Sequence, residues 1–143
     1  MAISVFTPRA DSLSNWTLIT SAAYTTSDST NYFQVDSFSS AGITVVCTTC
    51  SGTLDVYVQK LLPDNSSYDD IAVFTYTSNV FTTSGIRTLS FVNGGNSYHT
   101  DTDAALPAGT IVTAHMGARW RIKFAIGGAS GTSTFGVSGD FQA

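Results

Sequence analysis

Residues 54–62 have the sequence LDVYVQKLL, in which apolar and polar side chains alternate. In an extended chain, one face of this segment would carry Leu54, Val56, Val58 and Leu62, and the other Asp55, Tyr57 and Gln59. Successive side chains of a β-strand point to opposite faces of its sheet, so a period of two predicts a half-buried strand.

Two later segments repeat the pattern. Residues 119–126 (RWRIKFAI) place Trp120, Ile122, Phe124 and Ile126 opposite Arg119, Arg121, Lys123 and Ala125. In residues 132–141 (TSTFGVSGDF), one face would carry Phe135, Val137 and Phe141, and the other Thr134, Gly136, Ser138 and Asp140. We expect these three strands to supply much of the core.

Further β-like runs cover residues 16–24, 32–38, 42–47, 71–77, 86–92 and 111–116. Many short strands separated by turn residues predict an all-β domain, either a sandwich or a barrel. Residues 61–67 (LLPDNSS) contain the Pro, Asp and Asn of a hairpin turn, and the glycines of residues 127–131 predict a second, terminal hairpin. The long irregular stretch at 93–109 would be a functional loop or a crossing between sheets.

The chain has 143 residues, which suits one domain. We expect residues 1–15 to form an extended N-terminal arm and residues 16–143 to form the β domain. The arm contains a short apolar run at residues 3–6, and such a segment can add a strand to the open edge of a neighbouring sheet.

The charge balance disfavours two classes of partner. All ten acidic residues are Asp, and the formal net charge is −4, which leaves few cations to neutralise a row of phosphates. No stretch approaches the roughly 20 apolar residues that cross a bilayer, and residues 2–8 lack the features of a secretory signal. We therefore expect neither a nucleic-acid nor a membrane partner.

Cys47 and Cys50 form a C-x-x-C pair, but the remaining candidates for zinc ligands, His99 and His115, stand alone on other segments. A redox motif would need a helix after Cys47, where the sequence instead has Thr, Ser and Gly. We expect free thiols at a strand end, with a local disulfide as the alternative, and no cofactor or structural metal.

Other candidate sites have plainer interpretations. Asp101 and Asp103, with Asn96, could offer oxygens to Ca²⁺, but no EF-hand spacing accompanies them, and a solvated loop is the simpler interpretation. The adjacent Asp69 and Asp70 would face opposite ways in a strand and are expected to be a charged strand entry. The chain has no G-x-S-x-G motif and no Glu, so we expect a protein that is not an enzyme.

The most informative cluster is the basic stripe formed by Arg119, Arg121 and Lys123. These are three of the six cationic residues, and they lie on one face of one predicted strand of an acidic protein. A focused patch of this kind favours an acidic partner. Alternatively, the stripe could guard a solvent-facing strand, or pair across the sheet with Asp55, Asp69 or Asp140.

Two segments resemble a family of small β-sandwich proteins encoded among bacteriophage structural genes. They are LDVYVQKLLPDNSSYDDI at residues 54–71, with its L-D-V-x-x-Q, Pro/Asp turn and D-I, and RWRIKFAIGGASGTSTFGV at residues 119–137, with its I-G-G and F-x-V. Phe74 and residues 85–91 (GIRTLSF) lie between them, so the similarity spans roughly the C-terminal two thirds; residues 1–53 and 93–109 depart from the pattern.

The resemblance implies a virion protein, and most of all a capsid decoration, or cement, protein with a jelly-roll-like antiparallel β-sandwich. Such a protein is made in the host cytoplasm, sits on the outer capsid surface, binds the major capsid protein and often forms a homotrimer. We expect the interface to involve Ile3, Val5, Phe6 and Arg9 of the arm together with the basic stripe. The alternative is a head-fibre, tail or baseplate module that binds host glycans through Tyr57, Tyr68, Tyr76 and Tyr98.

Overall fold

The fold is almost entirely β, as the sequence predicts. The computed structural model describes residues 3, 12–36, 38–62, 64, 66–81, 85–92, 119–128 and 131–142. These residues contain no α-helix. Their strands are β1 (Ser12–Tyr24), β2 (Asp28–Ser29), β3 (Phe33–Gln34), β4 (Ser40–Leu61), β5 (Tyr68–Val80), β6 (Ile86–Val92), β7 (Arg119–Gly127) and β8 (Ser133–Gln142).

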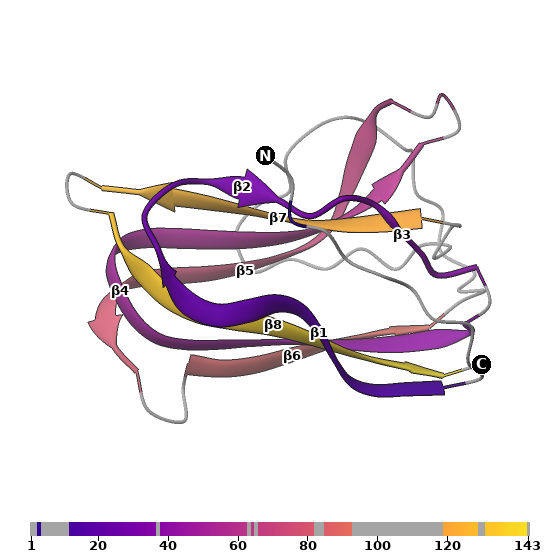
Figure 1. The fold of residues 1–143 in the computed structure, drawn as a ribbon, viewed down its shortest axis with the longest axis horizontal. Helices are drawn as coiled ribbons and strands as arrows, with labels where there is room; N and C mark the ends of the chain where they lie inside the picture. The colour runs from indigo at the N-terminus through magenta and orange to yellow at the C-terminus, as the bar shows by residue number, and fades with distance from the viewer. Residues whose placement is uncertain are drawn as a thin grey trace.

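The long strand β4 organises the sheet. Its first half pairs with β8 on one side and β6 on the other, whereas its second half pairs with β7 and β5. Strand β1 extends the sheet beyond β8, while β2 and β3 extend it beyond β7, and all of these pairings are antiparallel. Figure 1 shows β4 crossing the molecule, bending near its label and returning, so that the sheet curls into a half-barrel.

The bend of β4 depends on a close approach of two backbone segments. A Cβ atom on Gly52 would overlap the carbonyl oxygen of Gly127 and lie 3.1 Å from the Cα of Gly128. Gly128 itself has a φ of 101°, a left-handed conformation that favours glycine. Register shifts between Cys50 and Thr53 in the pairing with β5 mark the irregularity of β4 at the same place.

This bend changes two sequence predictions. The separate strands expected at residues 42–47 and 54–62 are one continuous strand. The terminal hairpin expected around residues 127–131 is wrong, because β7 and β8 pair with successive halves of β4 instead of with each other. Turn residues indicated a reversal correctly, but they could not show that β7 and β8 would both follow β4 around its bend.

The other predicted hairpin is confirmed. Strands β4 and β5 pair as far as Leu61 and Tyr68, and the amide of Leu62 donates a hydrogen bond to the carbonyl of Ser67. The Asp64 carboxylate closes the turn by accepting hydrogen bonds from the amides of Ser66 and Ser67 and from the Ser67 hydroxyl. These bonds hold the pKa of Asp64 at about 2.

The core fills the concave side of the curled sheet with aromatic rings. Trp120 of β7 is fully buried and packs against Phe91 of β6 and Phe141 of β8, with ring centroids 5.0 and 6.3 Å away. Phe124 of β7 packs against Phe135 of β8 at 5.1 Å. Rings from the two halves of the sheet therefore pack against each other, which keeps the sheet curled.

The strand β1 begins at Ser12, within the segment assigned to the N-terminal arm. Its pairing with β8 extends from the Ser12–Gln142 pair to the Tyr24–Ser133 pair. Regular sheet structure thus starts four residues earlier than the predicted boundary at residue 16.

Gly52→Ala should destabilise the protein by about 1–3 kcal/mol, because the new methyl group forces apart the two backbones at the bend. Gly42→Ala is the matched control on the same strand: its Cβ would lie 3.9 Å from the nearest side-chain atom, and its effect should stay within about 1 kcal/mol. Urea unfolding of both variants measures the difference. Equal stabilities would show that the close approach does not maintain the bend.

Candidate functional site

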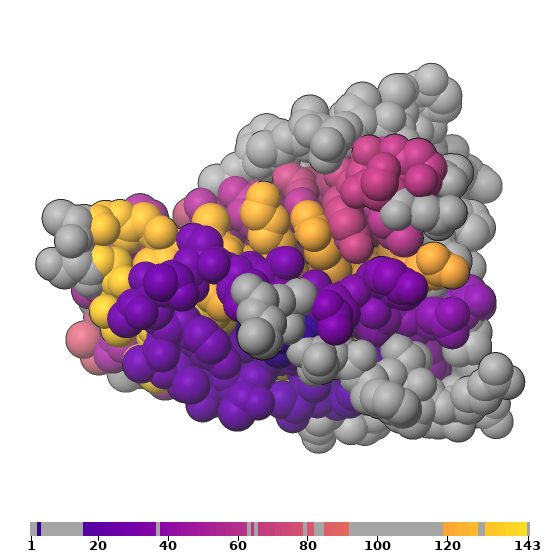
Figure 2. Space-filling model, turned by 45° about the horizontal axis from the view of Figure 1, so that its top comes forward, coloured from indigo at the N-terminus to yellow at the C-terminus, as the bar shows by residue number. Residues whose placement is uncertain are grey.

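The basic stripe lies on the outer face of β7, as its alternation predicts. Trp120, Ile122 and Phe124 are 0, 0 and 1% exposed on the core side of the strand. On the other face, Arg119 and Arg121 are partly exposed and Lys123 is exposed. In Figure 2, the orange atoms of β7 reach the surface between the violet atoms of the N-terminal strands and pink atoms from the middle of the chain.

Each cation of the stripe lies over a tyrosine ring. The guanidinium carbon of Arg119 is 4.9 Å from the ring centroid of Tyr32, and that of Arg121 is 3.6 Å from the centroid of Tyr68. The Lys123 ammonium is 5.7 Å from the centroid of Tyr57, its cross-strand partner on β4. Such contacts contribute about 0.5–1 kcal/mol each at exposed sites, and they restrict the orientation of long side chains.

A chain of hydrogen bonds fixes the central cation more firmly. Arg121 Nε donates to Gln59 Oε1 at 2.7 Å, and Gln59 Nε2 donates to Asp70 Oδ1. The three residues lie opposite one another on β7, β4 and β5, and Gln59 and Asp70 are each only 6% exposed. The guanidinium of Arg121 is therefore held by a buried amide on one side and a ring on another.

The sequence left open that the stripe pairs across the sheet with Asp55, Asp69 or Asp140. The described contacts of the stripe are instead with tyrosine rings and the amide of Gln59. Asp55 accepts a hydrogen bond from the Thr75 hydroxyl at 2.8 Å. In the strand register, Asp69 lies opposite Lys60 on β4, and Asp140 lies opposite Gly42. The three cations therefore stack on tyrosine rings and remain partly or fully exposed on the surface of an acidic chain.

Tyr57 keeps its phenol proton at neutral pH. Burial raises the pKa of Tyr57, and the nearby carboxylates of Asp55 and Asp70 raise it further. A neutral ring presents its electron-rich face to a cation, so the contact of Lys123 with Tyr57 does not depend on pH in the physiological range.

Asp69 and Asp70 are at the entry of a strand, as the sequence suggested, but they do not lie at the surface. Both lie at the start of β5 and are buried, with exposures of 1% and 6%. Asp70 belongs to the hydrogen-bond chain of Arg121, which explains why a carboxylate is tolerated there.

Within residues 1–11 of the arm, the structure describes one residue, Ile3. Its amide donates to the carbonyl of Ser29 at 2.8 Å, and its carbonyl accepts from the amide of Asn31 at 2.7 Å, as a parallel bridge to Thr30. The Ile3 side chain packs, half-buried, against the core. Val5, Phe6 and Arg9 lie outside the described residues, so the structure places one of the four expected arm residues, at an edge of its own sheet.

The two cysteines are free thiols, as expected, but they lie in the interior of β4 and not at a strand end. Cys47 is 1% and Cys50 3% exposed, and burial is the main cause that raises the pKa of Cys47 to about 11. No cluster of three metal-binding side chains occurs in the part of the chain that the structure describes. His99, His115, Asn96, Asp101 and Asp103 lie outside it.

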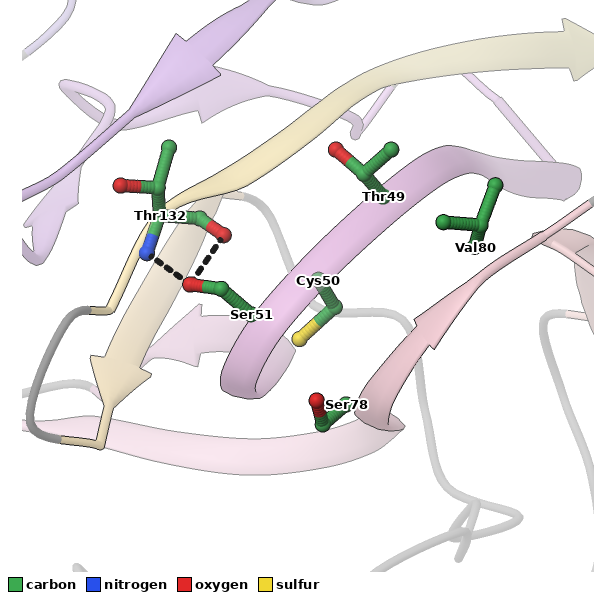
Figure 3. Close-up of a pocket in the computed structure, with 6 residues that line it drawn as sticks. All are labelled: Thr49, Cys50, Ser51, Ser78, Val80 and Thr132. Carbon is green, nitrogen blue, oxygen red and sulfur yellow. Dashed lines mark hydrogen bonds between the residues drawn. The ribbon is translucent and has the colours of Figure 1, made fainter.

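A shallow hollow beside the β4 bend is lined by Thr49, Cys50, Ser51, Ser78, Val80 and Thr132 (Figure 3). The Ser51 hydroxyl accepts a hydrogen bond from the Thr132 amide at 2.8 Å and donates to the Thr132 carbonyl at 3.0 Å. These bonds tie β4 to the entry of β8. The lining contains no carboxylate, imidazole or amine, and its titratable side chain is the Cys50 thiol.

Comparison with known proteins found no matching family model, no similar curated protein and no similar solved structure. The described part of the chain has no helix with the length and hydropathy needed to cross a membrane. Function must therefore be argued from the basic stripe and its setting.

Sequence reasoning found the cations but missed the groups that hold them. Tyr57 and Gln59 were visible as the outer face of residues 54–62, yet their contact with β7 depends on strand register. Tyr32 and Tyr68 come from segments far apart in sequence and carry no local signal of this role.

Arg121→Ala should destabilise the protein by about 1–3 kcal/mol while leaving it folded, since it removes the donor to the buried Gln59 and the contact with Tyr68. Lys123→Ala, on the same face but exposed, should lower the free energy of unfolding by no more than about 0.5–1 kcal/mol, since it removes only the contact with the Tyr57 ring. Chemical denaturation measures both values. A neutral Arg121→Ala would mean that the hydrogen-bond chain contributes nothing to stability.

The thiols should resist modification in the native protein. Because the thiolate is the reactive form and the pKa of Cys47 is about 11, labelling with a disulfide reagent at pH 8 should be on the order of 100-fold slower than in denaturant. A time course with and without urea tests this expectation. Immediate labelling of two thiols under native conditions would contradict their burial.

Proposed function

We propose that this protein is a non-enzymatic structural component of a bacteriophage virion, which decorates the capsid and clamps neighbouring major capsid protein subunits. The observation that carries the proposal is the tyrosine-backed basic stripe on β7. A rigid row of cations on a chain of net charge −4 is suited to docking on an acidic protein surface.

Preorganisation is what separates this stripe from an ordinary charged strand. Long cationic side chains lose conformational freedom when they bind, and that loss weakens association. Here the rings of Tyr32, Tyr57 and Tyr68 and the amide of Gln59 already restrict the three cations. Less freedom remains to be lost on docking, so a larger part of the electrostatic attraction contributes to affinity.

The finer fold assignment in this proposal is a jelly-roll-like β-sandwich. The aromatic packing between the two halves of the curled sheet supports it, because it matches the face-to-face packing of sandwich layers. A continuous β4 that belongs to both halves makes the domain stiff. Stiffness suits a part whose task is mechanical.

The clamp would work through several weak contacts at once. A homotrimer on the outer capsid surface engages several capsid subunits together, and linked contacts gain from effective concentration. The contacts are assigned to the basic stripe and to the arm, with Ile3, Val5, Phe6 and Arg9. In this proposal the protein is made in the host cytoplasm and acts on the virion without a cofactor, nucleic acid or membrane.

The glycan-binding alternative has less support. Tyr76 is 1% exposed and donates its hydroxyl to the carbonyl of Gly85, which leaves little ring surface for a sugar. Tyr57 and Tyr68 each have a cation over the ring. Tyr98 lies outside the described residues.

Lys123→Gln should weaken binding to empty capsids, assembled from the major capsid protein of the same genome, by about two- to fivefold, the factor for an exposed ion pair of ~0.4–1 kcal/mol. Co-sedimentation at several salt concentrations gives the affinity, and added salt should reduce the difference between variant and parent.

Ser90→Asp is the control, because it shifts the net charge equally at an exposed position of β6. Its binding should stay close to that of the parent chain. If the parent protein does not sediment with capsids at all, the decoration proposal fails; if both variants weaken binding equally, net charge matters and the stripe does not.

A further inference from the structure

The backbone beside β2 forms a pairing site that hydrogen bonds to β7 hold in place. The Thr30 amide donates to the carbonyl of Ile122 at 2.8 Å, and the Thr30 hydroxyl accepts from the Ile122 amide at 2.9 Å. Thr30 is 2% exposed, so β7 holds it on one side. On its other side, the Ser29 carbonyl and the Asn31 amide point outward; we call residues 29–31 the acceptor edge.

The contacts of Ile3 show what this edge accepts. The bound backbone is parallel to it and is held by one hydrogen bond to Ser29 and one from Asn31. The bound side chain is a β-branched aliphatic group that packs against core residues. The edge therefore recognises an extended segment with an apolar side chain at the central position, which is the mode of strand addition.

We propose that the acceptor edge binds the N-terminal segment of a second copy of this chain, so that copies associate by exchanging arms. A second copy carries the same Ile3 and can make the same two hydrogen bonds and the same apolar contact. Exchange of an identical element changes no local contact, which makes it a low-cost route to association.

The small size of the contact favours exchange. Among the described residues, one bridge and one half-buried side chain hold Ile3 to its own sheet, whereas the pairing of β1 with β8 spans the length of both strands. An open sheet edge is also a ready template for a strand from another chain.

Arm exchange would also close an assembly. Each copy offers one arm and one acceptor edge, and these are different surfaces, so the contact is head-to-tail and forms a ring when the rotation closes. The inference rests on the proposed function in one respect, namely that copies of this chain associate as a homotrimer. Neither the basic stripe nor a capsid takes part in it.

The test compares the full-length protein with Ile3→Asp, whose charged side chain cannot pack at the acceptor edge. Analytical ultracentrifugation should show an assembly larger than a monomer for the parent, monomers for Ile3→Asp, and parent-like association for Ile3→Val. A cooperative thermal transition in all three shows that folding is intact, and Ile3→Ala, with intermediate association, replaces Ile3→Asp if that variant does not fold.

A synthetic peptide of residues 1–9 probes the edge directly. Added to isotope-labelled Ile3→Asp protein, it should shift the amide resonances of residues 29–31 in a saturable way, and the same peptide with Asp in place of Ile3 should not. A parent that stays monomeric at all concentrations, or a peptide that causes no shifts, would overturn the inference.

The outcome is independent of capsid binding. Lys123→Gln should leave self-association unchanged, and Ile3→Asp protein should retain the salt-sensitive part of capsid binding that belongs to the stripe. Loss of self-association in Lys123→Gln would place the contact between copies at the stripe and would also overturn arm exchange.

Discussion

The close approach of Gly52 to Gly127 and Gly128 is the constraint on which the arrangement of the sheet depends. Without a Cβ atom at Gly52, the backbone of β4 can turn beside the end of β7. The turn lets one strand of 22 residues serve two halves of a curled sheet, with partners on both of its sides in each half. The apolar faces then meet across the concave side, where Trp120, Phe124 and Phe141 fill the space between them.

The same bend determines what the outer surface carries. Because β7 pairs with the second half of β4, its cations lie beside Tyr57 and Gln59, and β5 brings Tyr68 and Asp70 to the next position. A buried carboxylate, a buried amide and a partly exposed guanidinium then form one hydrogen-bonded chain across three strands. The contacts that hold the stripe are therefore set by the pairing of the three strands.

The edges of the sheet have a different character from its faces. At the β2 edge, the backbone itself is the binding element, and Thr30 connects it to β7 through two hydrogen bonds. In the two proposals, the basic face attracts an acidic surface and the edge accepts a strand, so they are separate means of association. Together they support the proposed role of the protein in an assembly.

The sequence by itself determined the all-β character, the faces of the alternating residues in 54–59, 119–126 and 134–141, the bounds of β6, the turn at residues 61–67 and the alignment of Arg119, Arg121 and Lys123. Period-two alternation is local, because neighbouring side chains of an extended chain must point in opposite directions. Only the tertiary structure decided that β4 is continuous, that β7 and β8 pair with successive halves of it instead of with each other, and that tyrosines and Gln59 hold the cations. Those outcomes depend on register between strands and on a backbone approach between Gly52 and Gly127, contacts between residues far apart in the chain that no local pattern encodes.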